Sequence, residues 1–384
     1  MKKFLWTILF IQICLSLSYN KEYTFIADPL LKAIQGVSLV DHKIEEIYYP
    51  GKELDPNYSL FVFDGTFSRE VGQKYIGQYP IAFSFIAGFL LKLPLVSISI
   101  FSLFLLGCSI FFLNRVTYFG YFFLILYFSS SIINNSYFDL NETGPFFFLN
   151  ALGFGFFISY FKTEKYRDIL FGLFFVATAT WFRLESILFG FSITLASFVV
   201  LPKQRILKML PTILIASFPV LLFFLFNHFH YGHYLGPRYF FNFSEDTTFG
   251  QRILRMISMS LLYFDKTGLK LGLFFVMPVL GLAIYFCFKN RNQLSKLELF
   301  SLYVFCLQFI FISFSAPNDG ITFTSRYHIL EILPGLVLVN FLVRNFSNQK
   351  IVNALFSFSL LCQLVFSIGF IFFFSGNQKV SIFC

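Results

Sequence analysis

A few charged residues stand at the ends of long apolar stretches of the chain. Asp28 follows the first apolar stretch, and Arg183 and Glu185 form a short polar corner between two later ones. Arg326 precedes a tyrosine at the edge of a further stretch, and Arg238 precedes a tyrosine within the loop from residue 227 to about residue 267. A carboxylate can take a proton from a hydroxyl, and a guanidinium presents a fork of donors that matches phosphate. These residue types can therefore accept a proton and bind an anionic group.

The elements that position these residues are membrane helices. Of the 384 residues, 57% are hydrophobic and only 13% are charged, which is too little polar surface to cover a soluble fold. The apolar runs are continuous rather than alternating, which excludes a membrane β-barrel and predicts helices. We therefore expect an all-α, polytopic transmembrane helical bundle that forms a single domain over residues 1–384.

The apolar runs predict about eleven spans. Residues 1–18 are either a cleaved signal peptide or a retained first helix, and either form exports the segment after it. The later spans are expected near residues 95–113, 116–133, 144–160, 168–182, 186–201, 209–226, 269–288, 298–315, 328–343 and 351–374.

The short basic loops alternate along the chain with the loops that carry the candidate residues. By the positive-inside rule the basic side is cytoplasmic, so the net charge of +9 indicates topology and not nucleic acid binding. We expect a multi-pass protein of the cell inner membrane with a cytoplasmic N-terminus and a periplasmic active site. The basic loops are Arg115, Lys162–Arg167, Lys203–Lys208, Lys289–Lys296 and Arg344–Lys350.

The large first outer loop, about residues 20–80, lies closest to the first span. Asp28 and Pro29 predict the start of an amphipathic helix over about residues 25–39, since aspartate caps helices and proline suits the first helical position. Asp28 is a structural cap in one interpretation. In the other, it is a carboxylate at the lipid boundary that meets both a lipid-borne and a soluble substrate. A juxtamembrane helix is expected over residues 80–91.

Several outer segments, in their order and common face, resemble the GT-C superfamily of polytopic glycosyltransferases, which take a sugar from a polyprenyl-phosphate carrier. The resemblance covers nearly the whole chain in architecture. Its segments are Asp28 after the first span, Tyr48–Pro56, Lys74–Phe83, Trp181–Glu185 and Ser325–His328 before a Leu-Pro pair.

The resemblance implies transfer of a sugar to an acceptor hydroxyl with inversion, and Asp28 as the general base. Many relatives have an acidic pair where this chain has Asp28 and Pro29, so Asp64 is the substitute base. The departing lipid phosphate gains negative charge, which cationic groups stabilise in the transition state. The expected substrate-binding residues are Arg326, Arg238, Arg183, Glu185, Tyr79, Tyr327 and His328.

Structural interpretations of these residues remain open. Arg238 can extend to lipid headgroups, and Arg326 with its neighbouring tyrosine can be an aromatic-belt anchor. Arg183 and Glu185 can be an ion pair that fixes their corner.

No metal or cofactor is expected. His228, His230 and His233 lack a carboxylate at fixed helical spacing, and no phosphate-cradling glycine loop occurs in the sequence. The expected partners are a polyprenyl-phosphate sugar donor, a glycan, lipid or protein acceptor, and membrane lipids. Neither the sugar nor the acceptor can be deduced from the residues.

Two other functions compete with this one. A secondary transporter usually has ionisable residues near the middle of its spans, whereas the predicted spans here have almost none. An envelope polysaccharide polymerase or ligase usually has its largest outer loop late in the chain, whereas here it comes directly after the first span.

Overall fold

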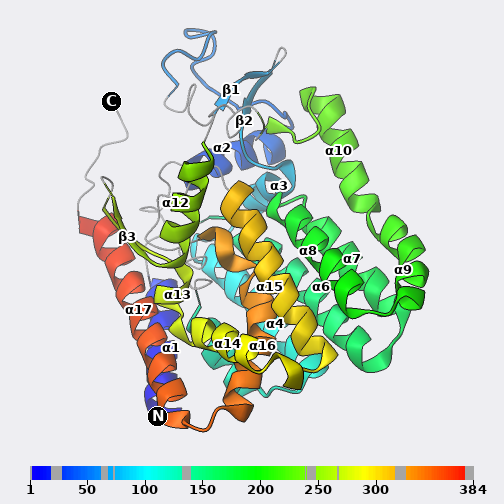
Figure 1. Ribbon diagram of the computed structural model, residues 1–384. Helices are drawn as coiled ribbons and strands as arrows, with labels where there is room; N and C mark the ends of the chain where they lie inside the picture. The colour runs from blue at the N-terminus through cyan, green and yellow to red at the C-terminus, as the bar shows by residue number, and fades with distance from the viewer. Residues whose placement is uncertain are drawn as a thin grey trace.

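The structure is a computed structural model, and it describes residues 2–18, 28–61, 68–71, 74–131, 140–237, 239, 248–265, 268–315 and 326–376. Helices dominate this part of the chain (Figure 1). The first half contains α1 (Lys2–Ser18), α2 (Asp28–Val40), β1 (Ser68–Val71), β2 (Lys74–Gly77), α3 (Ile81–Leu90), α4 (Val96–Thr117), α5 (Tyr121–Ser129), α6 (Thr143–Thr163), α7 (Tyr166–Ala179) and α8 (Glu185–Val200). The second half contains α9 (Lys203–Ala216), α10 (Phe218–Tyr231), α12 (Phe249–Ser260), β3 (Leu262–Asp265), β4 (Gly268–Leu271), α13 (Leu273–Val276), α14 (Pro278–Lys289), η3 (Arg291–Gln293), α15 (Lys296–Ser315), η4 (Arg326–Ile329), α16 (Ile332–Asn345) and α17 (Gln349–Gly376).

Four helical segments among the described residues are long and apolar enough to cross a membrane. They are α4, α6, α15 and the run Lys203–Tyr231, which joins α9 and α10. The other apolar helices are 10–17 residues long over the parts that could be assessed. The expectation of a mainly helical membrane protein is thus confirmed at this level.

The bundle is built around α6, which lies between α4 and α7 (Figure 1). Lipid tails are as apolar as leucine, so helices in a membrane associate through close packing instead of hydrophobic burial. Gly153 of α6 and Gly172 of α7 permit this, because a Cβ on Gly153 would lie 2.8 Å from the carbonyl oxygen of Gly172. Close to this contact, the buried rings of Phe154 and Phe157 of α6 stack on Phe300 of α15.

Helices α2 and α3 and the β1–β2 hairpin, which come between α1 and α4 in the chain, lie together at one end of the bundle (Figure 1). Helices α2 and α3 cross through Gly36 and Gly88, and a Cβ on Gly36 would lie 2.6 Å from the backbone nitrogen of Gly88. The two helices predicted for this part of the chain are present, since α2 begins at Asp28 and α3 covers Ile81–Leu90.

Strands account for the differences from the predicted elements. Antiparallel β1 and β2 pair Ser68 with Gly77 inside the outer loop, and β3 and β4 form a second hairpin. The predicted span over residues 269–288 is wrong at its start, where β4 and the four-residue α13 precede α14. Gly272 explains the interruption, because a Cβ there would lie 2.3 Å from the backbone nitrogen of Leu261.

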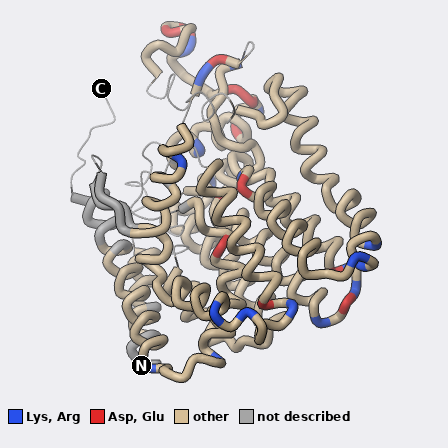
Figure 2. The backbone as a smooth tube through the Cα atoms, in the orientation of Figure 1, with Lys and Arg blue, Asp and Glu red and all other residues tan. Residues whose placement is uncertain are grey.

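The charges divide between the two ends of the bundle. Figure 2 shows many Lys and Arg residues at the end where α6 finishes and α7 and α9 begin. Acidic and basic residues are mixed at the opposite end, around α2 and the β1–β2 hairpin. The candidate site lies toward this mixed end.

Candidate functional site

A buried ion pair joins the outer loop to the bundle. The Nζ of Lys32, on α2, lies 2.7 Å from Oε2 of Glu142, the residue before α6, and both side chains are 5% exposed. Burying two charges is costly, and the loss of one partner from such a pair destabilises a protein by about 3–5 kcal/mol. The pair therefore fixes α2, the helix that begins at Asp28, against the start of α6.

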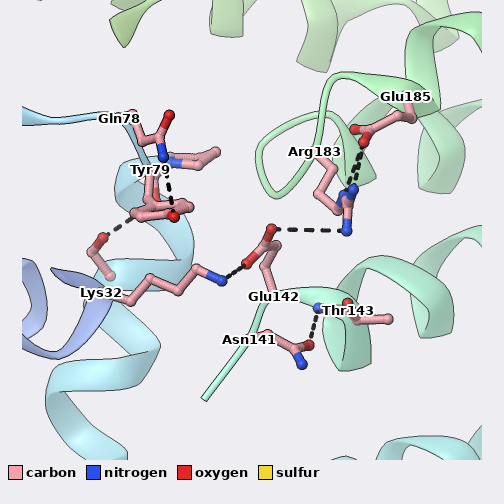
Figure 3. Close-up of polar contacts among 10 residues, drawn as sticks. Lys32, Gln78, Tyr79, Asn141, Glu142, Thr143, Arg183 and Glu185 are labelled. Atoms are coloured by element: carbon pink, nitrogen blue, oxygen red, sulfur yellow. Dashed lines mark hydrogen bonds and ion pairs between the residues drawn. The ribbon is translucent and has the colours of Figure 1, made fainter. Parts of the chain in front are cut away.

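The same carboxylate faces a second cation, Arg183, in the corner between α7 and α8. The Nη1 of Arg183 lies 3.9 Å from Oε1 of Glu142. Its Nε and Nη2 donate hydrogen bonds to Oε1 of Glu185 at 3.1 and 2.6 Å. Lys32, Glu142, Arg183 and Glu185 thus form a continuous row of alternating charge, which we call the charge row (Figure 3).

Local structure explains why Arg183 reaches this position. The chain leaves α7 through a turn in which the backbone N–H of Arg183 donates to the carbonyl of Ala179, and α8 then begins at Glu185. Burial acts to lower the pKa of Arg183, but the charges of Glu185 and Glu142 reverse this effect and raise the pKa above its usual range. Arg183 is therefore a permanent buried cation.

Aromatic rings surround both cations. Lys32 Nζ lies 4.6 Å from the ring centroid of Tyr79, a distance that allows a cation–π contact. The guanidinium carbon of Arg183 lies 5.4 Å from the ring of Phe146 and 5.8 Å from that of Tyr327. The phenolic oxygen of Tyr79 accepts a hydrogen bond from Gln78 (Figure 3).

The structure brings several of the predicted site residues together. Arg183 and Glu185 are bonded to each other, and Tyr79 and Tyr327 contact the cations of the charge row. Asp28 begins α2 and stands four residues, about one helical turn, before Lys32. The side chain of Asp28 lies outside the described part of the structure.

Three other predicted residues contribute no side-chain geometry. Asp64 and Arg238 fall outside the described residues. Arg326 begins the short turn η4, directly before Tyr327, and its side chain is not described.

His328 is fully buried. Its Nδ1 lies 2.8 Å from Oε1 of Glu331, and both side chains are 0% exposed. The imidazole also stacks on Phe309 of α15, with ring centroids 4.8 Å apart. In this arrangement His328 fastens η4 to the start of α16.

Two members of the charge row were not among the predicted site residues. Lys32 is the one basic residue in α2, whose sequence is DPLLKAIQGVSLV, and Glu142 precedes the apolar run of α6. Charge in an apolar setting was the signal available for both. Nothing in the sequence pairs them, because they are more than one hundred positions apart.

The histidines of the predicted outer face make separate contacts. His230 Nδ1 lies 3.1 Å from Oε1 of Glu45, and Lys74 Nζ lies 2.7 Å from Oε2 of the same glutamate. His228 and His233 stack on Tyr234 and Tyr239. Within the described ranges, no three His, Cys, Asp or Glu residues are grouped as metal ligands would be.

The charge row can position an anionic group, because it presents two buried cations from different elements at one place.

Comparison of the chain with protein-family models, with curated proteins and with solved structures finds no match.

Proposed function

We propose that the protein is an inner-membrane glycosyltransferase that transfers a sugar from a polyprenyl-phosphate donor to an acceptor hydroxyl at the periplasmic face. The observation that carries this proposal is the charge row, which ties the helix that begins at Asp28 to a buried arginine. A general base and phosphate-binding cations are the two requirements of such a transfer.

In this mechanism Asp28 accepts the proton of the acceptor hydroxyl as its oxygen attacks the anomeric carbon. The bond between that carbon and the phosphate oxygen breaks on the opposite side, and the configuration inverts. The lipid phosphate leaves with increased negative charge. Arg183 and Lys32 stabilise this charge from the charge row, together with Arg326, which begins the turn before Tyr327.

The orientation is inferred from the distribution of charge. Loops with excess Lys and Arg remain in the cytoplasm, and these residues gather at the end of the bundle remote from α2 (Figure 2). This distribution gives the proposed topology a cytoplasmic N-terminus. The apolar runs of the sequence give it about eleven spans in a GT-C-like arrangement. The end that contains the charge row then faces the periplasm.

Transfer from radiolabelled polyprenyl-phosphate sugars in isolated membranes tests the proposal. Wild-type protein is expected to produce a labelled acceptor, whereas Asp28→Asn abolishes nearly all transfer. Asparagine caps helices as well as aspartate does, so this loss is not attributable to the start of α2. The matched control is Asp41→Asn, because Asp41 comes directly after α2 and forms an exposed ion pair with Lys92. Full activity of Asp28→Asn removes Asp28 as the base.

Secondary transport is the second candidate, and the buried His328–Glu331 pair favours it. Ionisable pairs inside a helical bundle commonly mark ion or substrate pathways. No transfer with any lipid-linked donor, together with solute uptake that Glu331→Gln abolishes, would select transport over glycosyl transfer.

A further inference from the structure

We propose that Glu142 is an internal anion that holds, in the substrate-free protein, the place between Lys32 and Arg183 that a phosphate group of the substrate takes on binding. The inference rests on the proposed function, because it assigns the phosphate of the lipid donor to this place. It adds an exchange step that controls access to the site.

The geometry of Glu142 is that of a bridging anion. One carboxylate oxygen faces Lys32 Nζ at 2.7 Å and the other faces Arg183 Nη1 at 3.9 Å (Figure 3). The two cations come from α2 and from the α7–α8 corner, so the carboxylate joins separate parts of the fold. A phosphate, which also offers several oxygens, can bridge the same two groups.

The distances from Glu142 to Lys32 and to Arg183 are unequal. The distance to Lys32 is that of a charge-assisted hydrogen bond, which is usually about 2.7–2.9 Å, whereas the distance to Arg183 is longer. Arg183 is held instead by Glu185, through Nε and Nη2. Glu185 therefore keeps the guanidinium in position when Glu142 moves away, and Nη1 stays directed at the place that Glu142 leaves.

Charge balance favours exchange over simple addition. Lys32 and Arg183 carry two positive charges, and Glu142 and Glu185 carry two negative charges, so the buried row is neutral as it stands. A further anion beside these four residues would face the carboxylates of Glu142 and Glu185 as well as the two cations, and like charges placed side by side cost several kcal/mol. Displacement of Glu142 by the phosphate group removes the repulsion between these two anions. Glu142 precedes the first residue of α6, so its side chain can move without a change in that helix.

Binding of decyl phosphate to the purified full-length protein in detergent tests the exchange. Glu142→Gln removes the competing charge and leaves both cations, so the affinity for decyl phosphate is expected to rise by about tenfold or more, the equivalent of one charge-assisted hydrogen bond. The matched control is Glu164→Gln, which breaks an exposed ion pair with Arg205 at the other end of the bundle. Its affinity for decyl phosphate is expected to equal that of the wild type.

A purely structural role for Glu142 predicts that Glu142→Gln binds decyl phosphate no more tightly than the wild type does. Unchanged or weaker binding in folded Glu142→Gln overturns the inference. If this variant does not fold, Glu142→Asp replaces it, because the shorter carboxylate withdraws from the cations and should still tighten binding severalfold. Adding Lys32→Met to either variant should abolish the gain, and a gain that persists contradicts the assignment of the site.

Two further comparisons distinguish a lipid phosphate from free phosphate, and the exchange from the proposed function. Tightening seen with inorganic phosphate as strongly as with decyl phosphate would overturn the assignment to a lipid phosphate. Tighter binding of decyl phosphate in Glu142→Gln, without any sugar transfer by the wild type, supports the exchange and removes the proposed function. Sugar transfer by the wild type with unchanged binding of decyl phosphate in Glu142→Gln supports the proposed function and removes the exchange.

Discussion

Removal of Lys32 should cost far more stability than removal of Lys92, although the two form ion pairs of the same length. Lys32 lies 2.7 Å from Glu142 with both side chains 5% exposed, and Lys92 lies 2.7 Å from Asp41 with the side chains 51% and 42% exposed. Lys32→Met leaves Glu142 buried without this cation, which should cost about 3–5 kcal/mol. Lys92→Met breaks a solvated pair, whose contribution is about 0–1 kcal/mol.

Thermal unfolding in detergent, followed by the reaction of a thiol dye with the buried Cys287 in a background in which serine replaces the other cysteines, measures this difference. Lys32→Met is expected to unfold at a much lower temperature than Lys92→Met, which should resemble the wild type. The double variant Lys32→Met/Glu142→Gln should recover part of the loss, because the uncompensated negative charge is gone. Equal melting temperatures for Lys32→Met and Lys92→Met would refute the role of the charge row in fixing α2.

Three further predictions concern packing, pH and orientation. Gly36→Ala should destabilise the end of the bundle that contains α2 and α3 by about 1–3 kcal/mol, through overpacking where these helices cross. Gly107→Ala, where a Cβ has nothing within 4 Å, should leave the melting temperature unchanged or slightly raised. Equal melting temperatures for the two variants would contradict the close approach of α2 and α3. Burial acts to raise the pKa of Asp55, but hydrogen bonds from hydroxyl and backbone N–H groups of its turn lower it below its usual value. The ionised Asp55 should stabilise its loop fully above about pH 4, and this stabilisation should be lost as the pH falls through the lowered pKa. Limited proteolysis at decreasing pH measures the loss. A loop that first became sensitive near pH 6 would contradict this prediction. In intact cells a membrane-impermeant maleimide should label Leu54→Cys and not Tyr118→Cys, both at exposed positions, and the reverse pattern would invert the proposed topology.

Much of the helical arrangement could be predicted because apolar runs in a membrane protein are themselves the helices. The starts of α2 and α3 could also be predicted from local signals, an aspartate with proline in one case and a proline in the other. Each signal acts within a few residues. Local sequence was therefore sufficient for these elements.

The interruption before α14 was missed for a physical reason. Gly268, Gly272 and Pro278 occur within a run that is apolar enough for a span. Hydrophobicity alone does not distinguish a helix from a strand followed by a short turn. The close approach of Gly272 to the backbone of Leu261 is a tertiary contact that the run itself does not contain.

The candidate site was predicted only in part. Arg183 and Glu185 are two residues apart, so their pairing is local. The pairing of Lys32 with Glu142 depends on how α2 lies across the start of α6, which periodicity does not determine. The sequence alone therefore does not predict Glu142 as a site residue, although its carboxylate connects the two cations.

The rate of sugar transfer by purified Asp28→Asn at saturating donor is the most direct test of the account. A positioned base usually contributes about 10²- to 10⁴-fold, so kcat should fall by at least about 10²-fold while the affinity for decyl phosphate and the melting temperature stay near the wild-type values. A kcat within a fewfold of the wild type would contradict the assignment of Asp28, and with it the catalytic role proposed for the outer end of the bundle.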